Sequence, residues 1–386
     1  MSKHLSYRQK TNLGSFYTPL KLVNLVYETL AENIKGNSVD VVLEPACGYG
    51  AFFAKAFPQK KVRFIGADID PMALTLARSN FPNVEFKKTN MLSKIYRLKY
   101  GIEEKERLAI VGNPPYNDVT SHVKNRIKAE PCEIDEKVKT RDLGLSFMLA
   151  FAKLEPVYIA ILHPLSYLIK KNNFETLKPL MRNYTLLDAV VFSSREFSDT
   201  SKNSGFPIVA AIYEKNMRGT NYGQIIKRKF KTLENQEFSI SDFDYICKYI
   251  SKYPSNYSKI SEFKFFTMRD INALKRSRTF IKEDTANTIY IEPEKLPYYC
   301  YVDIFKDLIP KLPYYFGNLD VPFDRNSFEK LKDDFFILSI VKHPDIFAGK
   351  FSIPEPDRVN FARKRVLSYF DKLFKRVNNG NYIKEA

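Results

Sequence analysis

Short apolar runs alternate with longer stretches of mixed character through the first part of the chain. The runs predict strands at 39–44, 61–67, 84–86, 108–111, 157–162, 186–192 and 208–213. Periodic apolar residues between most of these runs predict helices. Strands that alternate with helices are typical of a mostly parallel sheet covered on both faces, so the predicted fold class is α/β.

Three helix starts are indicated by local residues. Thr18 before Pro19, Asp70 before Pro71, and Asp142 each place an oxygen-bearing side chain just ahead of an amphipathic stretch. Another helix is expected from Ala51, directly after a glycine turn. Polar stretches at 117–141 and 193–207 predict loops.

The pattern changes near residue 227. Strands and helices no longer alternate, prolines divide short segments, and aromatic residues become dense. We therefore predict two domains, an α/β domain over 1–226 and an α+β domain over 227–386. The final segment, 357–377, gathers apolar residues on one face and is predicted to be a packing helix with a solvated basic side.

The composition, and above all the net charge, indicates which kind of binding partner to expect. The chain has 386 residues, 44% of them hydrophobic, and a net charge of +17 with a pI near 9.4. A basic surplus of this size favours a polyanionic partner, because Lys and Arg that neutralise phosphates release counterions. A general compositional bias toward lysine would give the same surplus.

Cysteine and hydropathy patterns argue against several classes. Cys47, Cys132, Cys247 and Cys300 are widely spaced, which predicts reduced thiols and neither a disulfide framework nor a metal site. No apolar run approaches the length of a membrane span, and residues 1–13 are polar. We expect a cytoplasmic protein without a membrane association.

The strand at 108–111 ends in Gly112-Asn113-Pro114-Pro115-Tyr116. Two consecutive prolines can neither extend a sheet nor continue a helix, so they predict a stiff, extended turn. Such a turn holds the Asn113 side-chain oxygen, the Pro114 carbonyl and the Tyr116 ring close together. These groups suit an exocyclic amino group on a flipped base: two oxygens accept its hydrogens and the ring stacks on the base. A rigid turn with no chemistry is the simpler alternative.

Other candidate residues follow neighbouring strands. In an open parallel sheet, ligands bind beyond the carboxyl ends of the strands. Gly48 and Gly50 allow a close approach of backbone to ligand, and Asp68 is placed to accept the hydroxyls of a ribose. His163 also ends a strand, but its position before Pro164 favours a structural role.

Four motifs in this order resemble a known family. They are Phe16-Tyr17-Thr18-Pro19, Glu44-Pro45-Ala46-Cys47-Gly48-Tyr49-Gly50, Asp68-Ile69-Asp70-Pro71 and Asn113-Pro114-Pro115-Tyr116. Together they resemble the S-adenosylmethionine-dependent DNA adenine-N6 methyltransferases, and their order is that of the gamma group. The resemblance covers residues 14 to about 215. It implies a class I, Rossmann-like methyltransferase fold, with a mostly parallel sheet that contains one antiparallel strand, and a C-terminal target-recognition domain.

The resemblance also implies a role for each matching residue. The catalytic residues would be Asn113, Pro114, Pro115 and Tyr116. The residues that bind S-adenosylmethionine would be Phe16, Tyr17, Thr18, Glu44, Ala46, Gly48, Gly50, Asp68, Ile69 and Asn90. Asn90 replaces the aspartate of many family members, and Tyr49 replaces the small residue usual between the glycines. Phe206 and Phe197 are candidates to stack on the flipped base. No metal is required.

The implied function is site-specific methylation of the N6 amino group of adenine in double-stranded DNA, alone or beside a separate cognate restriction endonuclease. Related motifs occur in methyltransferases that act on RNA bases or on protein glutamine, since planar nitrogens pose the same chemical problem. The large aromatic and basic C-terminal part favours duplex DNA over RNA. The glutamine enzymes place a small helical domain before the sheet, whereas here only a dozen residues precede the first motif. A catalytically silent nucleic-acid-binding protein is a further alternative, against which the intact Asn113, Pro114 and Tyr116 argue.

Overall fold

A computed structural model describes residues 18–34, 38–116, 133–197, 205–254 and 261–375. The chain divides into two compact units, Met1–Gln236 and Glu237–Ala386. Most of the predicted loop at 117–141 and half of that at 193–207 lie outside the described residues. Within the described residues, no helix combines the length and apolar character that a membrane span requires.

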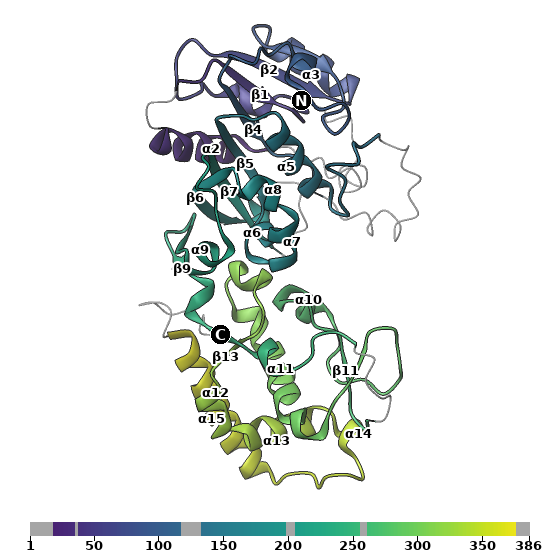
Figure 1. Ribbon diagram of the computed structural model, residues 1–386. Helices are drawn as coiled ribbons and strands as arrows, with labels where there is room; N and C mark the ends of the chain where they lie inside the picture. The colour runs from purple at the N-terminus through teal and green to yellow at the C-terminus, as the bar shows by residue number, and fades with distance from the viewer. Residues whose placement is uncertain (1–17, 35–37, 117–132, 198–204, 255–260, 376–386) are drawn as a thin grey trace. The chain divides into compact units, whose positions relative to one another are not determined.

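The first unit is built on a nine-stranded sheet in the order β3-β2-β1-β4-β5-β7-β6-β8-β9 (Figure 1). Its strands are β1 (Val41–Glu44), β2 (Arg63–Asp68), β3 (Glu85–Lys88), β4 (Leu108–Gly112), β5 (Tyr158–Pro164), β6 (Tyr184–Ser193), β7 (Pro207–Lys215) and β8 (Phe230–Thr232); β9 (Glu237–Phe238), the last in this order, lies past the boundary of the unit. Strands β1 to β5 run parallel, whereas β7 is antiparallel to both β5 and β6. The predicted α/β fold with a mixed, mostly parallel sheet is confirmed, and β7 is antiparallel to its neighbours as expected for one strand.

This topology places the candidate residues at one edge. In the parallel register, Val41 of β1 lies between Arg63 of β2 and Leu108 of β4. The carboxyl ends of these strands therefore meet at a common edge, as expected for an open parallel sheet. Glu44, Asp68 and Gly112 end β1, β2 and β4 and stand at this edge.

Helices accompany the strands of the first unit. They are α2 (Leu20–Asn33), α3 (Pro71–Asn80), α5 (Leu143–Lys153), α6 (Ser166–Ile169), α7 (Lys171–Thr176), α8 (Lys178–Met181) and α9 (Tyr222–Lys227), with 3-10 turns η1 (Ala51–Ala54), η2 (Arg97–Tyr100) and η3 (Ser194–Glu196). Asp70 and Asp142 accept backbone N–H groups of α3 and α5, so both predicted N-caps are confirmed.

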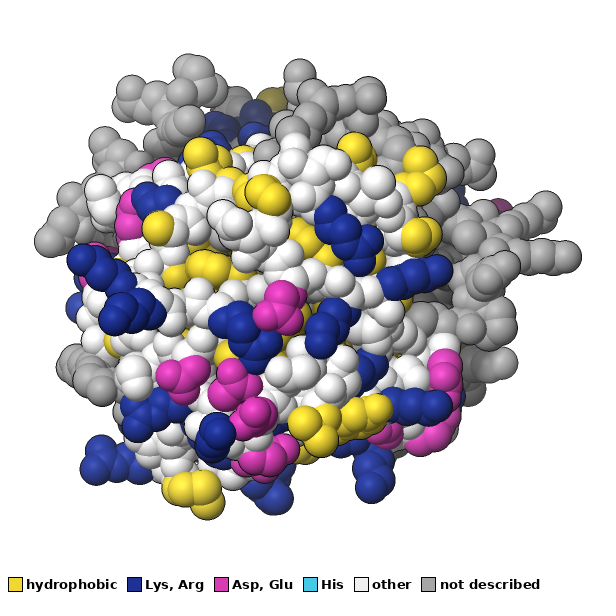
Figure 2. All heavy atoms as spheres, turned by 90° about the horizontal axis from the view of Figure 1, so that it is seen from above, with side chains coloured by type: hydrophobic (Ala, Val, Ile, Leu, Met, Phe, Trp, Pro, Cys, Tyr) yellow, Lys and Arg dark blue, Asp and Glu magenta, His cyan; other side chains and the backbone are white. Residues whose placement is uncertain are grey.

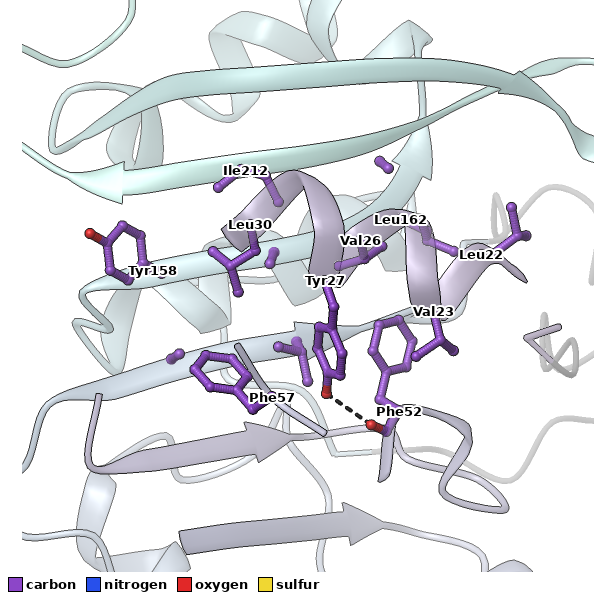
Figure 3. Close-up of a cluster of buried hydrophobic side chains, with 14 of the residues drawn as sticks. Leu22, Val23, Val26, Tyr27, Leu30, Phe52, Phe57, Tyr158, Leu162 and Ile212 are labelled. Carbon is purple, nitrogen blue, oxygen red and sulfur yellow. Dashed lines mark hydrogen bonds between the residues drawn. The ribbon is translucent and has the colours of Figure 1, made fainter. Parts of the chain in front are cut away.

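Helix α2 anchors the core that lies behind the candidate site (Figure 3). One face of α2 is almost fully buried, and it is formed by Leu22, Val23, Val26, Tyr27 and Leu30. This face packs with residues of β1, β4, β5 and β7, among them Val42, Val111, Leu162 and Ile212. The Tyr27 hydroxyl, which is also buried, donates to the Phe52 carbonyl at 2.8 Å. Burial of several large side chains, each contributing about 1.5–3 kcal/mol, holds α2 firmly on the sheet.

Two predicted helix starts differ from the structure. The helix expected from Ala51 is only the single turn η1, because Phe52 and Phe57 both pack edge-on against Tyr27. Lys55 is extended, with φ −125° and ψ 141°, which lets the chain return Phe57 to that ring. Helix α2 begins at Leu20 with Pro19 at its N-cap, so Thr18 does not cap it.

The second unit is mainly helical. Its helices are α10 (Ile271–Arg276), α11 (Leu296–Leu308), α12 (Arg325–Glu329), α13 (Lys332–Lys342), α14 (Pro344–Phe347) and α15 (Pro356–Lys375), with 3-10 turns η4 (Ile240–Asp242), η5 (Ile246–Lys248), η6 (Pro293–Lys295), η7 (Ile309–Lys311) and η8 (Tyr314–Asn318). Two antiparallel pairs complete it, formed by β10 (Asp244–Tyr245) with β13 (Pro322–Phe323) and β11 (Lys264–Phe266) with β12 (Thr288–Tyr290).

The core of the second unit is aromatic. Tyr301 is fully buried and contacts many aromatic rings, including Phe323, Phe335 and Phe370. Helix α15 contributes Val366, Phe370, Leu373 and Phe374 to the buried side, which supports the predicted packing helix over its described part. Residues 227–236, expected in the second domain, include β8, which pairs with β6 in the sheet of the first unit. The target-recognition role of the second unit stays a prediction.

The cap of α3 gives a direct test of the first unit's stability. Asp70 Oδ1 accepts from Met72 N at 2.9 Å and from Ala73 N at 3.3 Å. Asp70→Ala should lower the free energy of unfolding by about 1 kcal/mol, as measured by urea denaturation, because both N–H groups lose their acceptor. Asp70→Asn keeps an acceptor and should stay close to the wild type. Equal losses in the two variants would contradict this account.

Candidate active site

Strand β4 ends in the turn that carries Asn113. Gly112 has φ +149°, and a Cβ at this position would lie 3.5 Å from Glu44 Cγ, so the end of β4 runs close to the Glu44 side chain. Pro114 and Pro115 follow without helix or strand structure. The stiff turn therefore starts at the carboxyl edge of the sheet, next to a buried carboxyl group.

Asn113 is held by a residue distant in sequence. Its Nδ2 donates to the hydroxyl of Thr18, a buried residue just before α2, at 3.2 Å. Its Oδ1 is buried and has no hydrogen-bond partner within the described part of the chain. Buried polar atoms nearly always have a hydrogen-bond partner in native proteins. A buried acceptor without a partner is therefore expected to accept a hydrogen bond from a ligand. The amide orientation leaves one acceptor for a ligand.

The glycine turn after β1 is tied to Asp68. Gly48 and Gly50 have φ +50° and +79°, a region that disfavours other residues. Gly48 N donates to Asp68 Oδ2 at 2.7 Å, and Asp70 N donates to Asp68 Oδ1 at 2.9 Å. A Cβ on Gly48 would meet no atom of the described residues within 4 Å, so the described structure leaves space beside the turn. A carboxylate accepts about four hydrogen bonds, so Asp68 keeps acceptor capacity for a ligand hydroxyl.

A buried carboxyl group, that of Glu44, and a half-buried one, that of Asp68, stand together at this edge. Burial raises the pKa of Glu44 well above its ordinary range, and the neighbouring Asp68 raises it further. Burial also raises the pKa of Asp68, an effect that the N–H groups of Asp70 and Gly48 oppose. Glu44 Oε2 is buried without a partner in the described structure. This arrangement favours a cationic or N–H-bearing ligand, which would relieve the repulsion and satisfy the orphaned oxygen.

The remaining predicted cofactor residues have mixed surroundings. Ile69 is 55% exposed and presents apolar surface next to Asp68, and Ala46 is half-buried. Asn90 is engaged with backbone on both sides of its amide: Oδ1 accepts from Leu92 N at 2.9 Å and Nδ2 donates to Glu133 O at 2.7 Å. Phe16 and Tyr17 lie outside the described residues.

The three aromatic candidates differ in how deeply each ring is buried. Tyr116 is half-buried beside the core behind the sheet, and burial raises the pKa of its hydroxyl, so its ring stays neutral. Phe197 is 2% exposed and packs on Phe192 with ring centroids 6.1 Å apart. Phe206 is half-buried and keeps exposed surface. Burial leaves Phe206 better placed than Phe197 to meet a base.

The position of α5 near Tyr116 was not predicted. A Cβ on Gly144 would lie 2.9 Å from Tyr116 Cβ. The available signal was a glycine in the first turn of a predicted helix, since glycine disfavours helix and often marks a close approach.

His163 has a structural environment. It is fully buried, its Nδ1 lies 2.9 Å from the Pro164 carbonyl, and its Nε2 lies 2.8 Å from the Tyr213 hydroxyl. Burial lowers its pKa to about 4, an effect that the contact with the Pro164 carbonyl opposes. The ring is therefore neutral at physiological pH, and both nitrogens are already engaged.

The glycine turn, Asp68 and the asparagine turn thus gather at the carboxyl edge of a mostly parallel sheet, which defines an α/β protein with a candidate ligand site at that edge. The chain matches the family model described as N-6 DNA Methylase over residues 2–203, more than half of its length. The chain belongs to the N-6 DNA methylase family.

Two curated relatives share part of the sequence. The type II methyltransferase M.CvrRI of Paramecium bursaria Chlorella virus XZ-6E is 32% identical over 155 residues, which is 38% of each chain. The methylase subunit of the type I restriction enzyme MjaIX of Methanocaldococcus jannaschii is 29% identical over 131 residues, 30% of this chain and 21% of that subunit. The matches span well under half the length of these relatives.

Solved structures give weaker similarities. TrmN from Thermus thermophilus aligns with a TM-score of 0.32 and 20% identity, over 51% of this chain and 48% of that one. The N-methyltransferase NodS from Bradyrhizobium japonicum aligns with a TM-score of 0.30 and 13% identity, over 51% and 94%.

Burial of His163 predicts a loss of stability in acid. Between pH of about 6.5 and about 4, the unfolded chain binds a proton at this ring that the folded protein does not bind. This stability is complete above pH 6.5 or so and should fall by up to about 1.4 kcal/mol per pH unit below it. His163→Gln should flatten the dependence of the unfolding free energy on pH in this window. Tyr213→Phe keeps the imidazole and should retain the slope; an unchanged slope in His163→Gln would contradict the assignment.

Proposed function

We propose that this protein transfers a methyl group from S-adenosylmethionine to the N6 amino group of an adenine flipped out of double-stranded DNA. Membership of the N-6 DNA methylase family supports the reaction class. The observation that carries the proposal for these residues is the buried, unpaired Oδ1 of Asn113, an acceptor left open at the carboxyl edge of the sheet.

The asparagine turn would hold the target amino group. Asn113 Oδ1 and the Pro114 carbonyl would each accept one hydrogen of the amine, which directs the nitrogen lone pair away from the base plane. The Tyr116 ring would stack on the base, and Phe206 is the better placed candidate for its other face. The turn need not reorganise during the reaction, because Thr18 already fixes the Asn113 amide.

The edge beside this turn fits the cofactor. Glu44 Oε2 offers an orphaned acceptor, Gly48 borders open space, and Asp68 has lone pairs for ribose hydroxyls. Thr18, Ala46, Gly50, Ile69 and Asn90 complete the proposed set, with Phe16 and Tyr17. When bound, S-adenosylmethionine supplies a methyl group activated by a positively charged sulfur. The carboxyl groups of Glu44 and Asp68 would favour such a cation.

The proposed mechanism must also account for the proton that the target amine loses. His163 is neutral and both its nitrogens have partners, so it is not placed to take a proton from the amine. Asn113 and Pro114 provide oxygens that accept hydrogen bonds without removing a proton. We therefore propose that the amine loses its proton to solvent after methyl transfer.

The setting of the activity is a further part of the proposal. The names of both curated relatives come from restriction-modification systems. We infer that this chain also acts at a defined DNA sequence in the cytoplasm, alone or beside a separate cognate endonuclease. RNA-base and protein-glutamine methylation, or silent binding of nucleic acid, are the competing outcomes of the assays below.

The second unit offers a DNA-contacting surface around α10, formed by Arg269, Lys275, Arg276 and Arg278. All four side chains are exposed, and no carboxylate within the described residues forms an ion pair with them. Other lysines of this unit are paired, such as Lys264 with Asp284 at 2.8 Å.

An aromatic residue adjoins the α10 surface. Tyr253 is 54% exposed, and its neighbour Lys252 accepts a backbone hydrogen bond from Met268, the residue before Arg269. Unpaired cations with an adjacent aromatic ring suit the phosphate backbone. On the face shown in Figure 2, by contrast, basic and acidic side chains are interspersed.

The site assignment predicts opposite defects for two groups of variants. Asn113→Ala and Tyr116→Ala should bind S-adenosylmethionine almost as the wild type does but lose at least a hundredfold in kcat on DNA, since these groups act on the base. Asp68→Ala should instead weaken cofactor binding. Isothermal titration calorimetry measures binding of S-adenosylmethionine, and transfer of tritiated methyl groups to DNA measures turnover. Nucleoside analysis identifies the product.

The exposed Asn172→Ala on α7 is the control for these measurements. Equal loss of cofactor affinity in all three site variants would contradict the assignment. A labelled product other than N6-methyladenine, or label on RNA or protein instead, would overturn the proposed reaction.

The α10 surface predicts a change in salt dependence. Replacement of Arg269, Lys275 and Arg276 by alanine should make the slope of log K for DNA binding against log salt less negative by about 2 to 3, because each phosphate contact contributes about −0.9. Fluorescence anisotropy with a labelled duplex measures this slope. Lys248→Ala with Lys264→Ala removes two paired lysines and should have a smaller effect; an unchanged slope in the triple variant would place the interface elsewhere.

A further inference from the structure

We infer that Gly144 and Asp142 are positioning residues that seat the Tyr116 ring, and through it the target base. The inference rests on the proposed function for the role of Tyr116, but the packing that it describes can be tested without any methyl transfer. Neither residue belongs to the four motifs. Both lie at the start of α5, further along the chain than the asparagine turn.

Gly144 allows α5 to lie directly against two tyrosines. A Cβ built on Gly144 would lie 2.9 Å from Tyr116 Cβ and 3.1 Å from Tyr167 Cε2, with the Tyr167 hydroxyl closer still. Real Cβ atoms do not approach other carbons to 2.9 Å, so any side chain here must displace a neighbour. The absence of a side chain at Gly144 therefore sets how near Tyr116 lies to the helix.

The start of α5 cannot easily move away. Asp142 Oδ1 accepts from Gly144 N at 2.9 Å and from Leu145 N at 3.4 Å. The Thr140 hydroxyl donates to the Asp142 carbonyl at 2.6 Å, which holds the cap from the other side. Six of the next seven residues, 145–151, are at most 7% exposed and Leu149 is 8% exposed, so the helix is embedded. A clash at Gly144 must be relieved by a tyrosine rather than by the helix.

Of the two tyrosines, Tyr167 is held more firmly. Its hydroxyl donates to Asp142 Oδ1, and its ring stacks on His163 with centroids 5.6 Å apart and an interplanar angle of 11°. His163 in turn contacts the Tyr213 hydroxyl at 2.8 Å. Tyr116 is half-buried and belongs to no helix or strand. A methyl group at position 144 would therefore displace Tyr116.

A displacement of this kind should reduce catalysis without unfolding the protein. Return to an ordinary carbon–carbon distance needs a shift of roughly 1 Å, and misplacement on that scale can cost on the order of a hundredfold in rate. Helix propensity acts in the opposite direction, since alanine is favoured over glycine by about 1 kcal/mol within a helix. A loss of activity without a loss of stability would therefore show that Gly144 positions Tyr116 and is not needed for folding.

The chain contains a matched control for Gly144→Ala. Gly223 is the second residue of α9, as Gly144 is of α5, and it also follows a capping side chain, Asn221. A Cβ on Gly223 would meet only Asn221 Oδ1, at 3.3 Å. Gly144→Ala should lower kcat at least tenfold, with an unchanged KM for S-adenosylmethionine and an unchanged Tm. Gly223→Ala should stay within twofold of the wild type in kcat and KM and should not lower Tm.

A second measurement reports on position 116 directly. The natural chain has no tryptophan, so Tyr116→Trp introduces a single fluorescent indole. In that background, Gly144→Ala should shift the emission maximum and increase quenching by acrylamide, and Gly223→Ala should change neither. Identical emission and quenching in the two double variants would overturn the inference. This readout stands even if the wild-type protein methylates no DNA, an outcome that would overturn the proposed function alone.

A double variant identifies the ring that moves. Tyr167→Phe removes the hydroxyl nearest to a Cβ at position 144 but leaves the contact with Tyr116 unchanged. Gly144→Ala with Tyr167→Phe should therefore remain at least tenfold below Tyr167→Phe alone in kcat. Recovery to the level of Tyr167→Phe would show that only Tyr167 is displaced, and would overturn the positioning of Tyr116. Asp142→Asn keeps a capping oxygen and should retain activity, whereas Asp142→Ala should lower kcat with KM for the cofactor unchanged.

Discussion

The hydrogen bond from Asn113 Nδ2 to the Thr18 hydroxyl joins the turn after β4 to the residue that precedes α2. It decides which end of the amide faces the protein and which end stays open. Because α2 is fixed by its buried face, Thr18 is a firm partner, and the Asn113 oxygen is left in a defined place without a donor. An acceptor that is buried, rigid and unpaired is costly to a protein by itself, by about 1–3 kcal/mol. A ligand that brings a hydrogen to it recovers that cost.

Electrostatics at the same edge follow a similar principle. Removal from solvent raises the pKa of both Glu44 and Asp68, and the nearby Asp68 raises the pKa of Glu44 further. Backbone N–H groups from the glycine turn and from the start of α3 stabilise Asp68, whereas Glu44 keeps one oxygen without a partner. The region therefore favours positive charge and N–H donors, both of which the proposed cofactor carries. In the proposed function, the orphaned oxygen of Asn113 would meet the base and that of Glu44 would meet the cofactor.

The neighbourhood of Tyr116 shows how a site on a turn gains precision from rigid elements. Helix α5 is capped by Asp142 and embedded in the core, and Tyr167 is held between that cap and His163. These rigid neighbours restrict the movement of Tyr116 on one side, although Tyr116 itself lies outside any helix or strand. His163, a candidate from the sequence, supports Tyr167 as a neutral, hydrogen-bonded ring.

Features of this protein that depend on neighbours in sequence were predictable from sequence. Alternating apolar runs gave a mostly parallel sheet, Asp70 and Asp142 cap the helices that follow them, and the diproline turn ends β4 where expected. The four motifs indicated the family, because their residues and order are specific even without a structure. These inferences succeed since caps, turns and periodicity are set by interactions over a few residues.

Contacts between distant segments were decided only by the tertiary structure. Thr18 was expected to cap α2 and instead meets Asn113, a partner 95 positions away. The helix expected at Ala51 shortens to one turn because Phe52 and Phe57 both pack on Tyr27. Burial separates Phe197 from Phe206, and Gly144 is brought against Tyr116 by the docking of α5. Each outcome depends on which side chains share a small volume after folding, and local sequence carries no information about that.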